Sequence, residues 1–172
     1  MTGLPTKENI LVDEKCNVLL VDFGLVKIIS DLPNVPASSI GNGGAARYMS
    51  PELIDPEEFG LEKSDPTKPT DCYALGMVTY QTISGELPFQ KFQDTTVCLK
   101  VMQGYRPPRG SKFTDPLWKT VESCWARQPQ DRPIIQDILR DFEAASNSLE
   151  SLPSGHSGGM EEGGALLPTT TG

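Results

Sequence analysis

The sequence TDCYALGMVTYQTI, residues 70–83, has apolar side chains on nearly every face that a helix would present. An amphipathic surface helix carries such residues on one stripe only, whereas a helix that is apolar all round is buried on every side. We therefore predict a central, buried helix here. Thr70-Asp71 is a typical helix start, and Ser84-Gly85 is a typical helix end.

Helices are predicted on both sides of this stretch. Ser50-Pro51-Glu52 offers an N-cap hydroxyl, a proline at the first position and an acid in the first turn, while Pro56 and Gly60 indicate that this helix is short. Three later helices are expected at residues 94–103, 116–126 and 133–149. The last of these carries five apolar residues at helical spacing, namely Ile134, Ile135, Ile138, Leu139 and Phe142.

The N-terminal part predicts a β-hairpin. Two short apolar runs, residues 10–12 and 18–21, flank the polar turn DEKCN at residues 13–17. A long irregular loop rich in Pro, Ser, Asn and Gly follows at residues 30–49, and loops of this length are usually functional or mobile. The expected fold is mainly α with a small β-hairpin.

Composition excludes several classes of protein. The chain has 172 residues, 37% of them hydrophobic, and a net charge of −8, which argues against non-specific nucleic-acid binding. It contains neither a run of about 20 apolar residues nor a signal-peptide pattern, so a cytoplasmic protein is expected. The four cysteines form no C-x-x-C pair and are interpreted as reduced thiols. Residues 150–172 are rich in Gly and Ser and predict a disordered tail after a folded part at 1–149.

One candidate site lies at the open end of the hairpin. Asn9 precedes the first strand and Asp22 follows the second, so an antiparallel pairing makes them neighbours. Their oxygen atoms, beside Gly24, suit a hard cation such as Mg²⁺. Two polar residues that merely end their strands are the alternative that the geometry alone leaves open.

Six short motifs occur in the order and approximate spacing of the protein kinase C-terminal lobe. They are the Asn9 segment, D-F-G at 22–24, S-P-E at 50–52, D-C-Y-A-L-G at 71–76, S-G-E-L-P-F at 84–89, and C-W at 124–125 with R-P at 132–133. The chain thus resembles the tyrosine-kinase-like and related Ser/Thr kinases, over residues 1–149. The resemblance implies the C-terminal lobe of the α+β kinase fold, without its N-terminal lobe.

The resemblance also assigns roles to residues. Asp22 and Asn9 would hold Mg²⁺ ions on the phosphates of ATP, and Gly24 would let the backbone turn after the metal ligand. Glu52 would pair with Arg132 and tie the end of the mobile loop to the last helices. Asp71 would accept hydrogen bonds from the catalytic-loop backbone, although an ordinary helix-start residue is the alternative.

Other family positions are substituted or open to two interpretations. The catalytic base of the family motif H-R-D-L-x-x-x-N falls at Leu4, and leucine cannot orient or deprotonate a hydroxyl. Ser38 and Ser39 lie in the activation-loop segment, where they are phosphorylation candidates or exposed serines without a regulatory role. No sequence in the chain matches the Gly-rich loop or the β3 lysine, so weak or no ATP binding and no autonomous activity are expected from it.

The sequence is compatible with three hypotheses. The chain is part of a kinase that phosphorylates Ser/Thr on protein substrates, a pseudokinase remnant that binds regulatory proteins, or a helical interaction domain with no relation to nucleotides. Protein partners are expected under each hypothesis, and neither nucleic acid nor membrane is expected.

Overall fold

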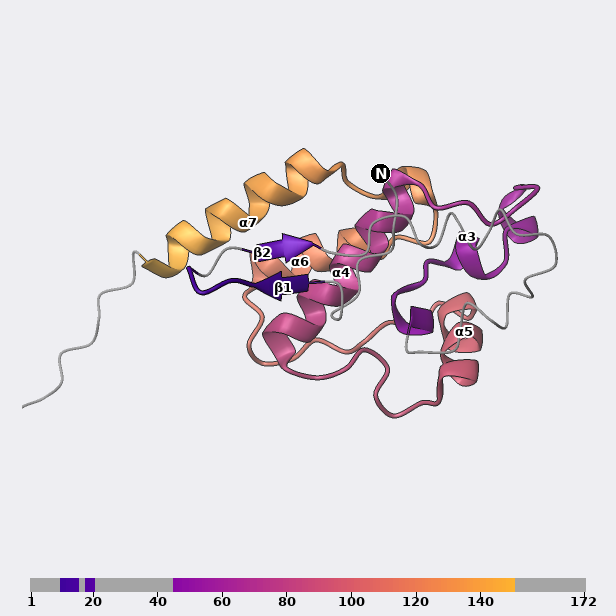
Figure 1. The fold of residues 1–172 in the computed structure, drawn as a ribbon, viewed down its shortest axis with the longest axis horizontal. Helices are drawn as coiled ribbons and strands as arrows, with labels where there is room; N and C mark the ends of the chain where they lie inside the picture. Colours follow the sequence, from indigo (N-terminus) through magenta and orange to yellow (C-terminus); the bar gives the residue numbers. More distant parts are fainter. Residues whose placement is uncertain (1–9, 16–17, 21–44, 151–172) are drawn as a thin grey trace, which may run out of the picture.

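The computed structural model describes residues 10–15, 18–20 and 45–150 of the chain. In these ranges the fold is mainly helical, with one two-stranded antiparallel sheet. This agrees with the predicted fold class. Figure 1 shows α4 crossing the middle of the molecule, α7 along one side, and α3 and α5 together at the far end.

The sheet is the predicted hairpin. Strands β1 (Ile10–Val12) and β2 (Val18–Leu20) pair in the register Ile10↔Leu20, Leu11↔Leu19 and Val12↔Val18. This register brings the beginning of β1 and the end of β2 together at the open end of the hairpin. The Mg²⁺ hypothesis for Asn9 and Asp22 requires this arrangement.

Helix α4 (Lys68–Ser84) is the predicted central helix, but it begins two residues before Thr70. The N-cap is Thr67, because its hydroxyl accepts from the backbone N–H of Thr70, while the Thr70 hydroxyl accepts from the backbone N–H of Thr67. This reciprocal capping box satisfies two N–H groups that a helix start leaves unpaired. Gly85 ends the helix in the left-handed conformation at φ 79°, as its sequence predicts.

The core forms around α4. Its side chains Tyr73, Ala74 and Met77 are fully buried, and α6 (Asp115–Cys124) packs along the helix. At Gly76 the two helices approach so closely that a Cβ atom would lie 2.7 Å from Trp125 Nε1 and 2.8 Å from Cys124 Cβ. Glycine is therefore required at this position by contact with α6, since any side chain would force the helices apart.

The remaining elements surround this pair of helices. They are the 3₁₀ turns η2 (Ala45–Tyr48), η3 (Glu57–Phe59) and η4 (Pro129–Asp131), with the helices α3 (Pro51–Ile54), α5 (Asp94–Met102) and α7 (Ile135–Glu150). Helix α5 packs on η2 and α3, and α7 packs on α6. The short α3 and the three later helices were predicted, with ends that differ by one or two residues.

Two predictions are wrong in detail. Ser50 precedes α3 in extended conformation, but its hydroxyl forms no cap hydrogen bond and is buried without a partner among the described residues. Residues 45–49, expected to be irregular loop, form the buried turn η2 and its exit. The apolar residues of α7, together with Ile134 just before the helix, form two rows. Ile138 is buried and Phe142 packs on the core, whereas Ile134, Ile135 and Leu139 are exposed. The described elements cover only the first row.

Candidate functional site

A buried ion pair connects two segments that are 80 residues apart in sequence. Arg132 donates from Nη1 to Glu52 Oε1 at 2.6 Å and from Nη2 to Glu52 Oε2 at 2.7 Å. The Arg132 side chain is 0% exposed and the Glu52 side chain is 3% exposed. The planar fork of a guanidinium matches both oxygens of a carboxylate, which fixes the orientation of the two groups as well as their distance.

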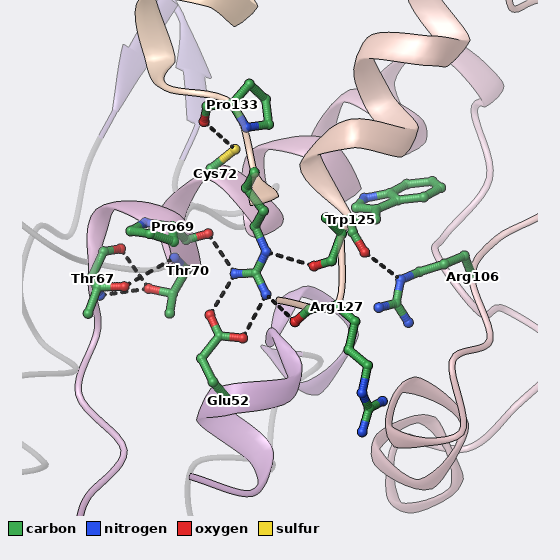
Figure 2. A network of polar contacts seen from close by, with 11 residues as sticks. Glu52, Thr67, Pro69, Thr70, Cys72, Arg106, Trp125, Arg127 and Pro133 are labelled. Carbon is green, nitrogen blue, oxygen red and sulfur yellow. Dashed lines mark hydrogen bonds and ion pairs between the residues drawn. The ribbon is translucent and has the colours of Figure 1, made fainter. Parts of the chain in front are cut away.

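The other donors of Arg132 extend this contact into a network, which Figure 2 shows. Nε donates to the Ala126 carbonyl at 2.9 Å, Nη1 to the Pro69 carbonyl at 2.9 Å, and Nη2 to the Arg127 carbonyl at 3.3 Å. One guanidinium thus joins α3, the first turn of α4 and the chain that follows α6. The carbonyls also supply the partners that a buried charge needs.

An aromatic ring lies beneath this network. The guanidinium of Arg132 lies 5.1 Å from the centre of the Tyr73 ring, and the guanidinium of Arg106 lies 5.3 Å from it. Both distances are within the range of cation–π attraction. Burial raises the pKa of the Tyr73 hydroxyl to about 12. Tyr73 thus stays neutral, and its ring attracts both cations.

Asp71 lies in the first turn of α4, close to the network. Its Oδ1 is buried and has no hydrogen-bond partner among the residues that the structure describes. Burial raises the pKa of this carboxyl to about 6, because removal from water disfavours the charged form. A buried acceptor without a donor is uncommon in folded proteins and requires an explanation.

A second buried arginine, Arg47 of η2, was not singled out in the sequence. Its guanidinium donates to the carbonyls of Pro88 and Phe89 at 2.8 and 2.9 Å and to the Phe92 carbonyl at 2.8 Å. It also forms an ion pair of 2.8 Å with Asp94 at the start of α5. Arg47 therefore fixes the turn before α3 to the loop between α4 and α5, including Phe89 at a φ of 55°. The only signal in the sequence was an isolated charge between Ala46 and Tyr48.

Six of the residues singled out from the sequence lie outside the described ranges, and nothing in the structure tests them: Leu4, Asn9, Asp22, Gly24, Ser38 and Ser39. Of the other three, Glu52 and Arg132 are in contact, and Asp71 lies one turn of α4 after the start of that helix. In the part of the chain that the structure describes, no group of three His, Cys, Asp or Glu side chains could hold a metal ion. The assignment of Mg²⁺ to Asn9 and Asp22 stays a prediction, because both residues lie outside the described ranges.

A family model described as protein tyrosine and serine/threonine kinase matches residues 6–142. The chain belongs to the protein kinase family. The match begins before the hairpin and ends inside α7, so it includes both partners of the buried ion pair.

Individual relatives agree with this assignment. The chain is 34% identical to the dual specificity protein kinase pyk3 of Dictyostelium discoideum over 84% of the chain and 10% of that protein. It is 32% identical to a probable serine/threonine-protein kinase of the same organism, over 76% of the chain and 13% of the relative. The serine/threonine-protein kinase VIK of Arabidopsis thaliana is 30% identical over 93% of the chain and 38% of the relative. The chain thus spans between a tenth and two fifths of the length of these relatives.

Among the described residues, no helix of this kinase domain is long and apolar enough to cross a membrane.

Proposed function

We propose that the whole protein transfers the γ-phosphate of ATP to serine or threonine hydroxyls of protein substrates. In this proposal residues 1–149 supply the C-terminal lobe of the kinase domain, and the tail predicted from residue 150 onward is not part of that lobe. The observation that carries it is the buried, bidentate contact between Glu52 and Arg132. It joins the S-P-E and R-P segments, whose pairing the kinase resemblance implies and no local feature of the sequence requires.

The nucleotide end of the site is assigned to Asn9, Asp22 and Gly24. The hairpin register supports this, because Asn9 is joined directly to Ile10 and Asp22 follows Leu20 after one residue, while Ile10 and Leu20 are paired. An amide and a carboxylate are the oxygen donors that Mg²⁺ takes together with phosphate and water. ATP would supply the phosphoryl group and Mg²⁺ would neutralise its charge.

Asp71 is assigned to the catalytic loop. Its Oδ1 is a buried acceptor without a donor among the described residues, and the resemblance gives it the backbone N–H groups of that loop as partners. In a complete kinase domain Asp71 would thus hold the loop against the start of α4. The neighbouring network of Arg132 fixes that start, so Asp71 and the ion pair act on the same part of the site.

Residues 1–172 by themselves are proposed not to transfer phosphate. Leu4 stands where the family motif has the aspartate that accepts the substrate proton, and a hydrocarbon side chain cannot take that part. The same observation favours a second candidate function, a pseudokinase that acts by binding other proteins. Helix α7 supports the second candidate to the extent that it exposes two large apolar residues, Ile135 and Leu139, next to the exposed Ile134 that precedes it.

Regulation and location complete the proposal. Phosphate on Ser38 or Ser39 would add negative charge to the segment before η2. Such a charge could order the segment by pairing with Arg or Lys side chains. Protein substrates or a regulatory protein are the proposed partners. The cytoplasm is the proposed compartment.

The test uses the native protein, captured from its source cells with an antibody against residues 150–172. Captured protein is incubated with radiolabelled ATP, Mg²⁺ and a protein substrate, and its mass is measured in the same preparation. Transfer to serine or threonine that is lost in Asp22→Ala, and kept in the exposed control Asp65→Asn, supports the kinase. If the native protein transfers no phosphate but binds a partner protein, the kinase proposal is wrong and the pseudokinase proposal takes its place.

A further inference from the structure

Helix α5 has one buried side and one exposed side. Val97 and Val101 are fully buried where the helix packs on η2 and α3. Thr95, Leu99 and Gln103 lie on the opposite side at helical spacing, and all three are exposed. Leu99 is 57% exposed, and a single exposed leucine is ordinary on a protein surface. What distinguishes Leu99 is its neighbours.

A Schellman motif at the end of α5 brings a tyrosine against a lysine. Gly104 has a left-handed φ of 85°. Its N–H donates to the Val101 carbonyl at 3.0 Å, and the N–H of Tyr105 donates to the Lys100 carbonyl at 2.9 Å. These two bonds define the motif. The Lys100 ammonium lies 4.3 Å from the centre of the Tyr105 ring and 5.6 Å from the centre of the Phe92 ring. Cation–π attraction thus holds the Lys100 side chain at the end of the helix.

Leu99, Lys100 and Tyr105 together are called the α5 patch. Because Tyr105 is 51% exposed, the patch combines two large exposed apolar groups with one cation. The surrounding stretch of chain is basic. Residues 95–114 contain no Asp or Glu, in a chain whose net charge is −8. The four cations of this range are Lys100, Arg106, Arg109 and Lys112.

The neighbouring carboxylates leave the charge of Lys100 uncompensated. Asp94, in the first turn of α5, forms an ion pair of 2.8 Å with the buried Arg47. Arg127 donates to a carbonyl in the last turn of α5 and is paired with Glu58. Each of these two pairs is neutral. Among the described residues, no carboxylate forms an ion pair with Lys100. The end of α5 is therefore positively charged in a protein whose net charge is negative.

We propose that the α5 patch binds an acidic segment of a partner protein. A carboxylate of that segment would pair with Lys100, and a neighbouring aliphatic side chain would cover Leu99 and Tyr105. Charge complementarity favours this occupant, because the patch attracts acidic segments and repels basic ones. The two aromatic rings already restrict Lys100, so less conformational entropy is lost when its ammonium pairs with a carboxylate. The inference goes beyond the proposed function and is independent of phosphoryl transfer.

The test measures peptide binding to the full chain by fluorescence anisotropy. The probe is a fluorescein-labelled peptide in which glutamates flank two leucines, EELLEE. Two control peptides replace the leucines by serines, EESSEE, or the glutamates by lysines, KKLLKK. Only EELLEE is expected to bind appreciably. Its affinity should fall as the salt concentration rises, because ions screen the attraction between exposed charges.

Paired variants locate the binding site. Lys100→Glu is expected to weaken the binding of EELLEE by about tenfold or more, whereas Lys119→Glu, which makes the same change at an exposed lysine of α6, should alter it by less than about twofold. Leu99→Ser should weaken binding by about fivefold. Its matched control is Leu139→Ser, because Leu139 is 56% exposed and lies on α7, which Figure 1 shows away from α5 along the long axis of the molecule.

Cross-linking checks the site in the parent protein without any substitution. A carbodiimide joins a glutamate of EELLEE directly to a nearby lysine amine, and the expected attachment is at Lys100. The inference is wrong if EELLEE does not bind, if EESSEE or KKLLKK binds equally well, or if either control variant weakens binding as much as its partner variant. Cross-links only at other lysines would also overturn it. A single-stranded oligonucleotide that competes with EELLEE at equal affinity would show that the patch recognises negative charge alone, which would exclude a site specific for a protein segment.

Discussion

Removal of the Arg132 side chain is expected to destabilise the domain severely. In Arg132→Met a flexible apolar chain of similar length replaces the guanidinium, so much of the packing volume is kept. The Glu52 carboxylate, 3% exposed, then loses both of its hydrogen bonds to Arg132. Three backbone carbonyls lose a donor at the same time, those of Pro69, Ala126 and Arg127.

The magnitude follows from the burial of the pair. Loss of one partner from a buried ion pair costs about 3–5 kcal/mol, mostly because the other charge stays buried without compensation. The free energy of unfolding of a domain is about 5–15 kcal/mol in total, so this change removes a large part of it. With an m-value of about 2 kcal/mol per molar, the midpoint of urea unfolding should fall by about 2 M.

The assay is urea unfolding followed by far-UV circular dichroism, with two comparison variants. Arg140→Met removes an exposed pair with Asp137, in which the side chains are 72% and 46% exposed, and should change stability by less than about 0.5 kcal/mol. The double variant Glu52→Gln/Arg132→Met leaves neither charge of this pair buried and should recover part of the loss.

The reasoning is refuted if Arg132→Met unfolds within about 1 kcal/mol of the parent protein. That result would mean that the Glu52–Arg132 pair contributes no more to the free energy of unfolding than an exposed ion pair does. If Arg132→Met does not fold at all, Arg132→Lys answers the same question, because it keeps the charge and loses the fork that contacts both oxygens of Glu52. An Arg132→Lys variant as stable as the parent would then refute the bidentate account.

Three further predictions concern other contacts. Gly76→Ala should destabilise by about 1–3 kcal/mol in thermal unfolding, since its Cβ would overlap α6, whereas Gly110→Ala, with its nearest neighbour at 3.8 Å, should be close to neutral. Burial raises the pKa of Asp71 from 3.8 to about 6, so the folded state binds a proton at this carboxyl more tightly than the unfolded state. The contribution of Asp71 therefore makes the free energy of unfolding fall as the pH rises from about 4 to 6. Asp71→Asn should flatten that part of the urea-midpoint profile, and a contribution of the opposite sign would show that donors hold the carboxylate. Arg47→Met should cost about 1–3 kcal/mol and speed limited proteolysis between residues 86 and 93; unchanged cleavage there would contradict its role in holding that loop.

The sequence was sufficient for elements whose pattern is local. The buried α4 follows from an apolar run on all faces, and the hairpin follows from two apolar runs around a polar turn. The contact of Glu52 with Arg132 was expected only from the kinase motifs, since residues 80 positions apart carry no local signal of their pairing.

The features that the sequence did not predict depend on tertiary neighbours. Whether Arg47 points to water or to three carbonyls is decided by the loop at 88–92, which packs beside η2 only in the folded chain. The exposed row of α7 is as apolar as its buried row, so periodicity alone could not separate Leu139 from Ile138. The hydroxyl of Ser50 had a preferred role as a cap, and the conformation of the folded chain overrides that preference.

The proposal that depends most on Leu4 is that residues 1–172, with a leucine at the family's base position, have no phosphoryl-transfer activity of their own. The direct test is the rate of radiolabel transfer from ATP to a serine- and threonine-containing protein, measured for the purified chain and for its Asp22→Ala variant. Both rates are expected to equal the rate without protein, because neither chain has a catalytic base at position 4. Transfer by the chain that disappears in Asp22→Ala would contradict the proposal, because these residues would then suffice for catalysis with Leu4 in place.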